Sequence, residues 1–143
     1  MVGAGEAGGG AGGAGGAGVD ALRHRAHADA IVQRAGDQLR ELLHELAAAI
    51  DPFPEFPGSF FSYGIEVEPL AGGSPLGCVV LGEDGELYEL QIGSEADQLD
   101  TDDPSAGRSE TRLPLEGLSP ADYVAYAYRA VAAAAAYLER GVR

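Results

Sequence analysis

The stretch from Leu76 to Ile92, LGCVVLGEDGELYELQI, constrains the fold of this chain more than any other segment. Two apolar runs, Gly77–Leu81 and Leu87–Ile92, are rich in residues that favour strands, and they flank a turn sequence that contains Asp-Gly. Asp-Gly between two such runs is the strongest short-range signal for a β-hairpin. We therefore predict an antiparallel hairpin, against which the other elements must pack.

The turn allows two registers for this hairpin. A three-residue loop at 83–85, with its glycine in the left-handed region, places Val80 opposite Tyr88. A two-residue turn at 84–85 shifts the first strand by one residue and places Leu81 opposite Tyr88. The sequence leaves both registers open.

The second strand of the hairpin alternates between apolar and polar residues. Tyr88, Leu90 and Ile92 share one face in either register, and Glu89 and Gln91 mark the opposite face as the more hydrated one. We expect the Tyr88 face to be the one that other elements cover.

Two amphipathic helices are predicted on either side of the strands. Residues 20–50 have Asp20 as a helix N-cap, and Gly36 within this helix would let another element approach closely, at a cost of about 1 kcal/mol relative to alanine. Their apolar positions recur at spacings of three and four: Ala28, Val32, Ala35, Leu39, Leu42, Leu46 and Ile50. A Ser-Pro-Ala-Asp sequence at 119–122 opens an alanine-rich helix that runs to about residue 140.

A Pro-Phe corner and a third strand connect the first helix to the hairpin. Residues 52–58 alternate prolines with Phe53 and Phe56, which predicts extended or turn-like backbone. The two rings either close one end of the core or form a docking strip for a protein partner. Residues 59–68 then alternate as an amphipathic strand, with one face formed by Phe61, Tyr63, Ile65 and Val67.

These elements predict an α+β fold: a long N-terminal helix, a three-stranded antiparallel meander, and a C-terminal alanine-rich helix packed on one sheet face. Residues 1–18 are almost entirely Gly and Ala, and we expect a disordered tail because glycine backbone is entropically costly to order. Residues 19–143 then form a single domain. Within it, residues 94–118 carry seven acidic residues and are predicted to be an acidic loop.

The charge of the chain excludes nucleic acid and anionic membranes as partners. The chain has 23 acidic residues against nine arginines and no lysine, a formal net charge of −14. Such a field repels phosphate groups. The order helix, three strands, helix is also that of double-stranded RNA-binding domains, but those place basic residues at the start of the second helix, where this chain has the sequence Ser-Pro-Ala-Asp. The exclusive use of arginine, with much Ala and Gly, indicates the codon bias of a GC-rich genome, and we expect a bacterial protein.

No catalytic or metal-binding pattern stands out. Cys78, the single cysteine, is interpreted as a small buried hydrophobe because it lies in a strand among valines, and no activating base for a nucleophile lies at a recognisable spacing. His24 and His27, one turn apart and following Asp20, could contribute to a metal site but fit an exposed polar turn better. The acidic loop lacks the ligand spacing of a calcium loop. We expect no cofactor and no metal, and with neither a signal peptide nor a membrane-spanning run we expect a cytoplasmic protein.

The helices carry more apolar surface than one sheet face can cover, which predicts self-association. We expect a two-fold homodimer through helical surface, because apolar surface in excess of internal cover marks an interface. The candidate interaction residues are Phe53, Phe56, Tyr123, Tyr126 and Tyr137. In the rival arrangement, part of the acidic loop folds back and completes a monomeric core with Leu113, Leu115 and Leu118.

The sequence therefore favours a non-catalytic protein-interaction or assembly module that self-associates and binds a protein partner. The alternatives are a domain that binds a small ligand between the sheet and the helices, or an enzyme whose site assembles from distant positions.

Overall fold

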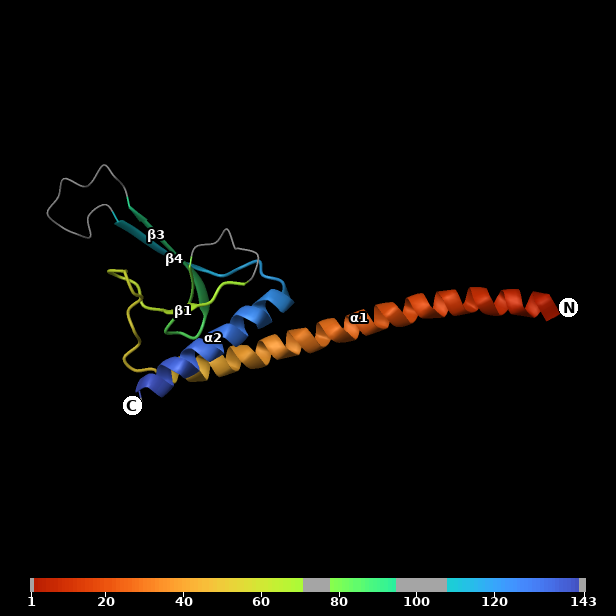
Figure 1. Cartoon of the computed structure of the whole chain (residues 1–143), viewed down its shortest axis with the longest axis horizontal. Coiled ribbons are helices and arrows are strands. Elements are labelled where there is room, and N and C mark those ends of the chain that lie inside the picture. The colour runs from red at the N-terminus through yellow and green to blue at the C-terminus, as the bar shows by residue number, and fades with distance from the viewer. Residues whose placement is uncertain (1, 71–77, 95–107, 142–143) are drawn as a thin grey trace.

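The computed structural model describes residues 2–70, 78–94 and 108–141 of the chain, and it is an α+β fold as predicted (Figure 1). The elements follow one another in the order α1 (Val2–Ala49), β1 (Ile65–Val67), β2 (Cys78–Leu81), β3 (Leu87–Ser94), β4 (Arg108–Pro114) and α2 (Pro120–Gly141). The strands form one antiparallel sheet in the order β1-β2-β3-β4.

The sheet has a fourth strand that the sequence analysis missed. β4 pairs with β3 from Tyr88↔Pro114 to Ser94↔Arg108, inside the segment 94–118 that was predicted to be a loop. Charged residues on one face of this edge strand hid its alternation, because edge strands often carry charges that a core strand would not. The prediction of three strands is therefore wrong, and the rest of that loop, residues 95–107, lies outside the described residues.

The hairpin adopts the register of the three-residue loop. Val80 pairs with Tyr88, and Gly85 has a φ of +83°. The N–H of Gly82 donates to the carbonyl of Glu86 at 2.9 Å and closes the loop. The prediction of a hairpin at this position is confirmed.

We expected the helices to cover the Tyr88 face of the hairpin, but they cover the opposite face. Val79, Leu81 and Leu87 lie in the core with the helices, whereas Val80 and Leu90 lie on the Tyr88 face. Three consecutive apolar residues in β2 make both faces apolar near the turn, and the helices pack at that end of the sheet. Of the polar residues of β3 that marked the hydrated face, Glu89 is partly buried opposite Val79 of this core, and Gln91, farther along the strand, is exposed.

The third predicted strand is shorter than its alternating pattern indicates. β1 is limited to Ile65–Val67, whose apolar side chains are buried, whereas Phe61 and Tyr63 are 69% and 47% exposed. The preceding segment instead curls into a turn, in which the Ser59 hydroxyl donates to the carbonyls of Phe56 and Ser62 at 2.8 Å. This turn redirects the chain before the strand begins, so Phe61 and Tyr63 do not share the buried face.

The two helices pack at Gly36, as the sequence analysis anticipated. A Cβ atom at this buried position would lie 3.3 Å from Cδ1 of Tyr123, and the Arg40 guanidinium carbon lies 4.8 Å from the centre of the same ring. Small residues of α2 complete the contact with α1 and the sheet: Ala127, Ala130 and Ala134 are fully buried. Leu115 and Leu118 also pack against this core, as the rival arrangement expected, whereas Leu113 is 45% exposed and does not.

The turn of the hairpin lies directly on the backbone of α1. A Cβ atom at Gly85 would lie 2.4 Å from Cδ2 and 2.7 Å from Cα of His44. Beside this contact, Nε2 of His44 lies 2.8 Å from Oε1 of Glu86. A side chain at position 85 would therefore push the sheet away from the helix.

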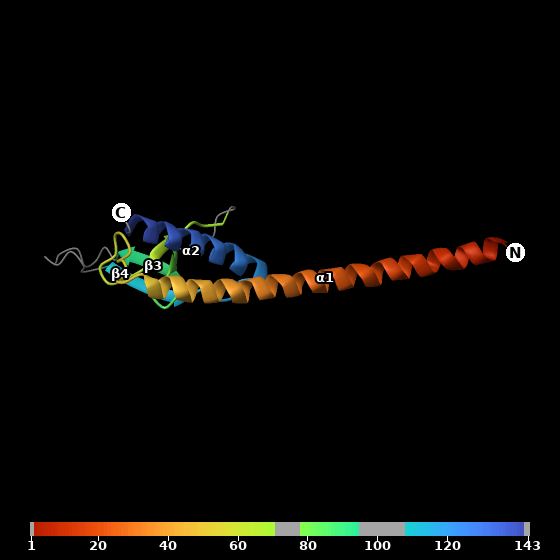
Figure 2. The same cartoon turned by 90° about the horizontal axis from the view of Figure 1, so that it is seen from below.

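Helix α1 begins at Val2 rather than at Asp20, so Asp20 lies inside the helix and is not its N-cap. Ten of the 17 residues from Val2 to Gly18 are glycines, which helix propensity disfavours, so local propensity did not predict the helix there. The first half of α1 projects well beyond the rest of the molecule in both views (Figures 1 and 2). We call residues Gly16–Ile31 the arm; every residue in it is exposed.

Removing residues 1–18 should leave the fold intact. The exposed arm begins within this segment and leads away from the core, so deletion should shift the melting temperature by no more than about two degrees. Differential scanning calorimetry of the truncated and full chains measures this. A drop of about ten degrees would show that the segment packs on the domain.

A second test concerns Gly85, with Gly117 as its matched control. Gly117 also has a positive φ, of +77°, but a Cβ there would meet nothing within 4 Å. Gly117→Ala should therefore cost only the left-handed conformation, about 1 kcal/mol of unfolding free energy, whereas Gly85→Ala adds the clash with α1 and should cost about 3 kcal/mol. Urea denaturation distinguishes the two. Equal losses would mean that the turn does not rest on the helix.

Candidate functional site

The five residues predicted to form an interaction surface contribute to the core of the chain. Phe56 and Tyr126 are buried, with 7% and 2% exposure. Phe53, Tyr123 and Tyr137 are partly buried and pack against the main core cluster, whereas Phe56 lies across the sheet against Val80 and Leu90. This placement favours the interpretation in which the Pro-Phe corner closes the core. An interface would then involve other side chains.

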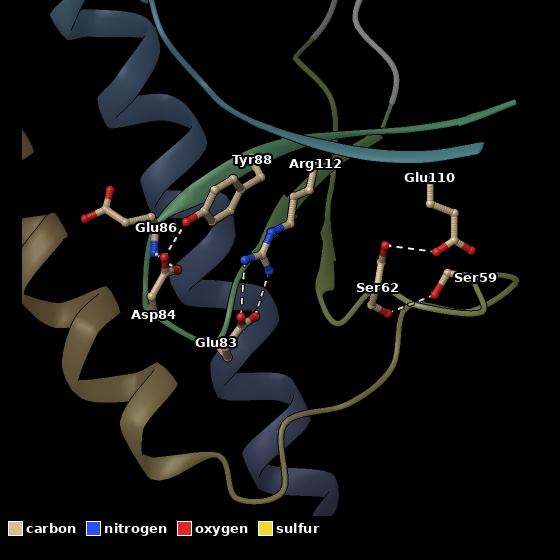
Figure 3. A network of polar contacts seen from close by, with 8 residues as sticks. All are labelled: Ser59, Ser62, Glu83, Asp84, Glu86, Tyr88, Glu110 and Arg112. Atoms are coloured by element: carbon tan, nitrogen blue, oxygen red, sulfur yellow. Dashed lines mark hydrogen bonds and ion pairs between the residues drawn. The ribbon is translucent and has the colours of Figure 1, made fainter.

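A polar network covers the sheet face opposite the helices, near the hairpin turn (Figure 3). The Arg112 guanidinium donates to both carboxylate oxygens of Glu83, at 2.7 and 3.2 Å. The same guanidinium carbon lies 4.2 Å from the centre of the Tyr88 ring, and the Tyr88 hydroxyl donates to the Asp84 carboxylate. The network therefore links the loop of the hairpin to β3 and β4.

The pKa values of these groups follow from their contacts. The hydrogen bond from Arg112 lowers the pKa of the Glu83 carboxyl, and burial opposes it only in part. The hydrogen bond to Asp84 raises the pKa of the Tyr88 hydroxyl to about 12. At neutral pH the phenol is therefore protonated and the carboxylate and guanidinium are charged, which is the arrangement of a structural tie rather than of an acid or base poised to react.

Glu110 makes a second tie on the same face (Figure 3). Its carboxylate accepts hydrogen bonds from the backbone N–H groups of Phe60 and Phe61, the latter at 2.9 Å, and from the Ser62 hydroxyl at 3.1 Å. It thereby holds the turn of the Pro-Phe corner against β4. Sequence reasoning missed this role because residues fifty positions apart meet only in the folded chain.

The other residues considered for chemistry do not converge on a site. Cys78 is exposed at the start of β2, so the prediction that it is buried is wrong: the buried part of this strand begins at the next residue. His24 and His27 are exposed on the arm. Among the described residues, no three His, Cys, Asp or Glu side chains come together where they could hold a metal ion. The same part of the chain contains no helix with the length and hydropathy of a membrane span.

A small cavity lies where α1 passes the start of α2. It has a volume of about 220 Å³ and is open to solvent; among its lining residues are Gly36, Asp37, Arg40 and Tyr123. Pockets that enclose drug-sized ligands are larger, from roughly 300 Å³ upward, and mostly apolar. This cavity therefore gives little support to the small-ligand alternative.

Besides the exposed rings of Phe60, Phe61 and Tyr63, two surfaces of the described residues are candidates for interaction. The first is the arm, on which Val19, Leu22 and Ile31 are 58%, 74% and 51% exposed. The second is a groove between β1 and α2 with a volume of about 600 Å³. The sequence contained a signal for the arm. Val19 and Leu22 are large apolar residues that lie before Ala28, where the regular apolar stripe of the helix begins, so the stripe that packs on the core does not include them.

Comparison with protein-family models, with curated protein sequences and with solved structures finds no match to this chain. The function therefore has to be argued from the surfaces of the molecule itself.

The tie between Glu83 and Arg112 predicts a pH dependence of stability. Because the folded pKa of Glu83 lies below its ordinary value of 4.5, the tie stabilises the fold above that pH, and its contribution is lost as the pH falls through the lowered pKa. Arg112→Gln should therefore lower the free energy of unfolding at pH 7. It should also reduce the decrease in that free energy between about pH 5 and pH 3.

Urea denaturation from pH 3 to pH 7 measures this difference, and Arg129→Gln is its control. Arg129 donates to the backbone carbonyls of Glu68 and Pro69, which do not titrate. Removing it should lower stability by a similar amount at every pH. Parallel pH profiles for wild type and Arg112→Gln would contradict the assignment.

Proposed function

We propose that this protein is a non-catalytic interaction module that forms a two-fold homodimer through helical surface, with the arm as its main element. The observation that carries the proposal is the exposure of every residue from Gly16 to Ile31, although this segment is helical. We further propose that it acts in the cytoplasm and that the dimer presents its acidic domain to a protein partner.

A helix without tertiary cover depends on a partner for its stability. Isolated helices of about 12–15 residues are marginal in water, and most helical stability in proteins comes from packing of an apolar face. The arm has 16 residues, includes glycine at positions 16 and 18, and exposes Val19, Leu22 and Ile31. Packing this surface against another molecule would stabilise the helix and bury the apolar side chains.

A second copy of the chain is the partner that the charge favours for the arm. Within the arm two arginines balance two aspartates, so it carries no net charge while the chain carries −14. Copies that meet through the arms avoid the repulsion between acidic domains that other contacts would create. Closed two-fold dimers are also the commonest assemblies of identical chains.

The proposal that the module is non-catalytic is supported by the polar side chains of the sheet, which are engaged in contacts within the fold. Arg112, Tyr88 and Glu110 are the side chains that a reactive site would draw on, and each is engaged in a contact that holds the fold together. An enzyme needs such groups directed at a cavity instead.

Sedimentation of the full chain between about 1 and 300 µM tests the proposal. We expect a concentration-dependent dimer of about 29 kDa, twice the 14.6 kDa of one chain. Leu22→Asp should weaken the dimer at least tenfold, because burying a carboxylate in an apolar contact is costly. A single 14.6 kDa species at all concentrations would overturn the proposal.

Leu113→Asp is the matched control for this experiment. Leu113 is an exposed leucine of 45% exposure on β4, far from the arm in sequence. The same substitution there should leave the dimer unchanged. Equal weakening by both substitutions would show that added negative charge, and not the arm contact, is responsible.

A further inference from the structure

Asp84 and Gly85 form the only Asp-Gly sequence in the chain, which contains no asparagine. In an open chain such a pair isomerises readily, because glycine has no side chain to obstruct the reaction. The amide nitrogen of the glycine attacks Cγ of the aspartic acid, and a carboxyl oxygen leaves as water. Water then opens the resulting succinimide ring, and opening at the α-carbonyl leaves an isoaspartyl residue whose side-chain carbons have become part of the main chain.

The folded hairpin engages both reacting groups elsewhere (Figure 3). Oδ1 of Asp84 accepts a hydrogen bond from the N–H of Glu86 at 3.0 Å, and Oδ2 accepts one from the Tyr88 hydroxyl. The attacking group, the N–H of Gly85, donates to the carbonyl of Gly82 at 3.0 Å. Attack therefore requires the carboxyl group to leave its two donors and the Gly85 amide to leave its acceptor.

The same contacts keep Asp84 in its unreactive charge state. The reaction consumes the neutral carboxyl group, because an ionised one has no oxygen that can leave as water. Burial would raise the pKa of the Asp84 carboxyl, but the hydrogen bonds from Tyr88 and from the Glu86 N–H outweigh it and hold the pKa below its ordinary value of 3.8. At neutral pH the carboxyl group is therefore ionised.

The turn has no room for the isoaspartyl product. Isomerisation adds one atom to the main chain between Cα of residue 84 and the nitrogen of Gly85. The loop is closed by the bond from the Gly82 N–H to the Glu86 carbonyl at 2.9 Å, and a Cβ at the buried Gly85 would lie 2.7 Å from Cα of His44. A longer backbone would therefore break the closure of the loop or push the turn away from α1.

We propose that Asp84 is an isomerisation site controlled by the fold. While the hairpin is closed, the hydrogen bond from Tyr88 and the backbone bonds of the turn prevent succinimide formation. When the hairpin opens, Asp84 isomerises, and the isoaspartyl chain no longer adopts the native fold. This inference is independent of the proposed dimer, because all the groups belong to one chain.

The rate of isoaspartate formation in folded and unfolded chains tests the proposal. An isoaspartyl methyltransferase transfers a labelled methyl group from S-adenosylmethionine to the new α-carboxylate, and every sample is denatured before labelling. At neutral pH the wild type should react at least about tenfold faster in guanidinium chloride, which unfolds it, than in buffer. Equal rates would overturn the proposal.

Asp84→Glu is the control for the site. Closure from a glutamate side chain would need a six-membered ring, which forms far more slowly, so this variant should lose most of the labelling in guanidinium chloride. Undiminished labelling would place the reaction at another aspartate and overturn the assignment. After the denaturant is removed, the fraction of wild-type chains that does not refold, measured by circular dichroism, should equal the isoaspartyl fraction. Full refolding of isoaspartyl chains would contradict the inference.

Tyr88→Phe tests the hydrogen bond itself. This substitution keeps the ring that lies against Arg112 and removes only the hydroxyl donor, so the folded variant should isomerise at least about fivefold faster than the folded wild type. Arg129→Gln removes contacts to the carbonyls of Glu68 and Pro69 instead, and its rate should stay within about twofold of the wild type. Equal acceleration by both would mean that general loosening of the fold sets the rate. If circular dichroism shows Tyr88→Phe to be unfolded, it should react as fast as the denatured wild type, and a slow reaction would overturn the proposal.

Discussion

The contact between Gly85 and the backbone of α1 at His44 is the constraint on which the rest of the structure depends. Only a glycine combines the positive φ that closes the three-residue loop with the absence of a Cβ atom, which would otherwise lie 2.4 Å from the His44 ring. This contact determines where the hairpin meets the helix. It thereby decides which face of the sheet receives the helices and which face is left to the Pro-Phe corner.

The opposite sheet face is covered by a loop segment and held by polar ties rather than by a second layer of helices. Phe56 supplies the apolar cover over Val80 and Leu90, and Glu110 binds the turn that carries this ring to β4. Arg112 connects the hairpin loop to β4 in the same way. Glu110 and Arg112 of the edge strand thus have structural partners, which explains why a strand with these charged residues can belong to the sheet.

The uneven distribution of charge along the chain bears on where two copies can form the proposed dimer. The arm is neutral overall, whereas the chain as a whole carries a formal charge of −14. Copies that meet through the arms therefore avoid the repulsion between acidic domains that other contacts would create.

Local sequence was sufficient for the elements whose signals lie in adjacent residues: the hairpin, the start of α2 and the close approach at Gly36. Sequence did not choose between the two registers, because Gly85 can take a positive φ in both. They differ at Asp84, which a two-residue type I′ turn would also place at positive φ, whereas no residue other than glycine among those described has a positive φ. Sequence missed β4, in which Glu110 and Arg112 are held by groups distant in sequence. It also assigned the core to the Tyr88 face, because Glu89 and Gln91 indicated that the opposite face was hydrated. Tertiary packing decides which face of the sheet is buried and how far α1 extends beyond the residues that pack on it, since burial depends on what lies opposite each side chain.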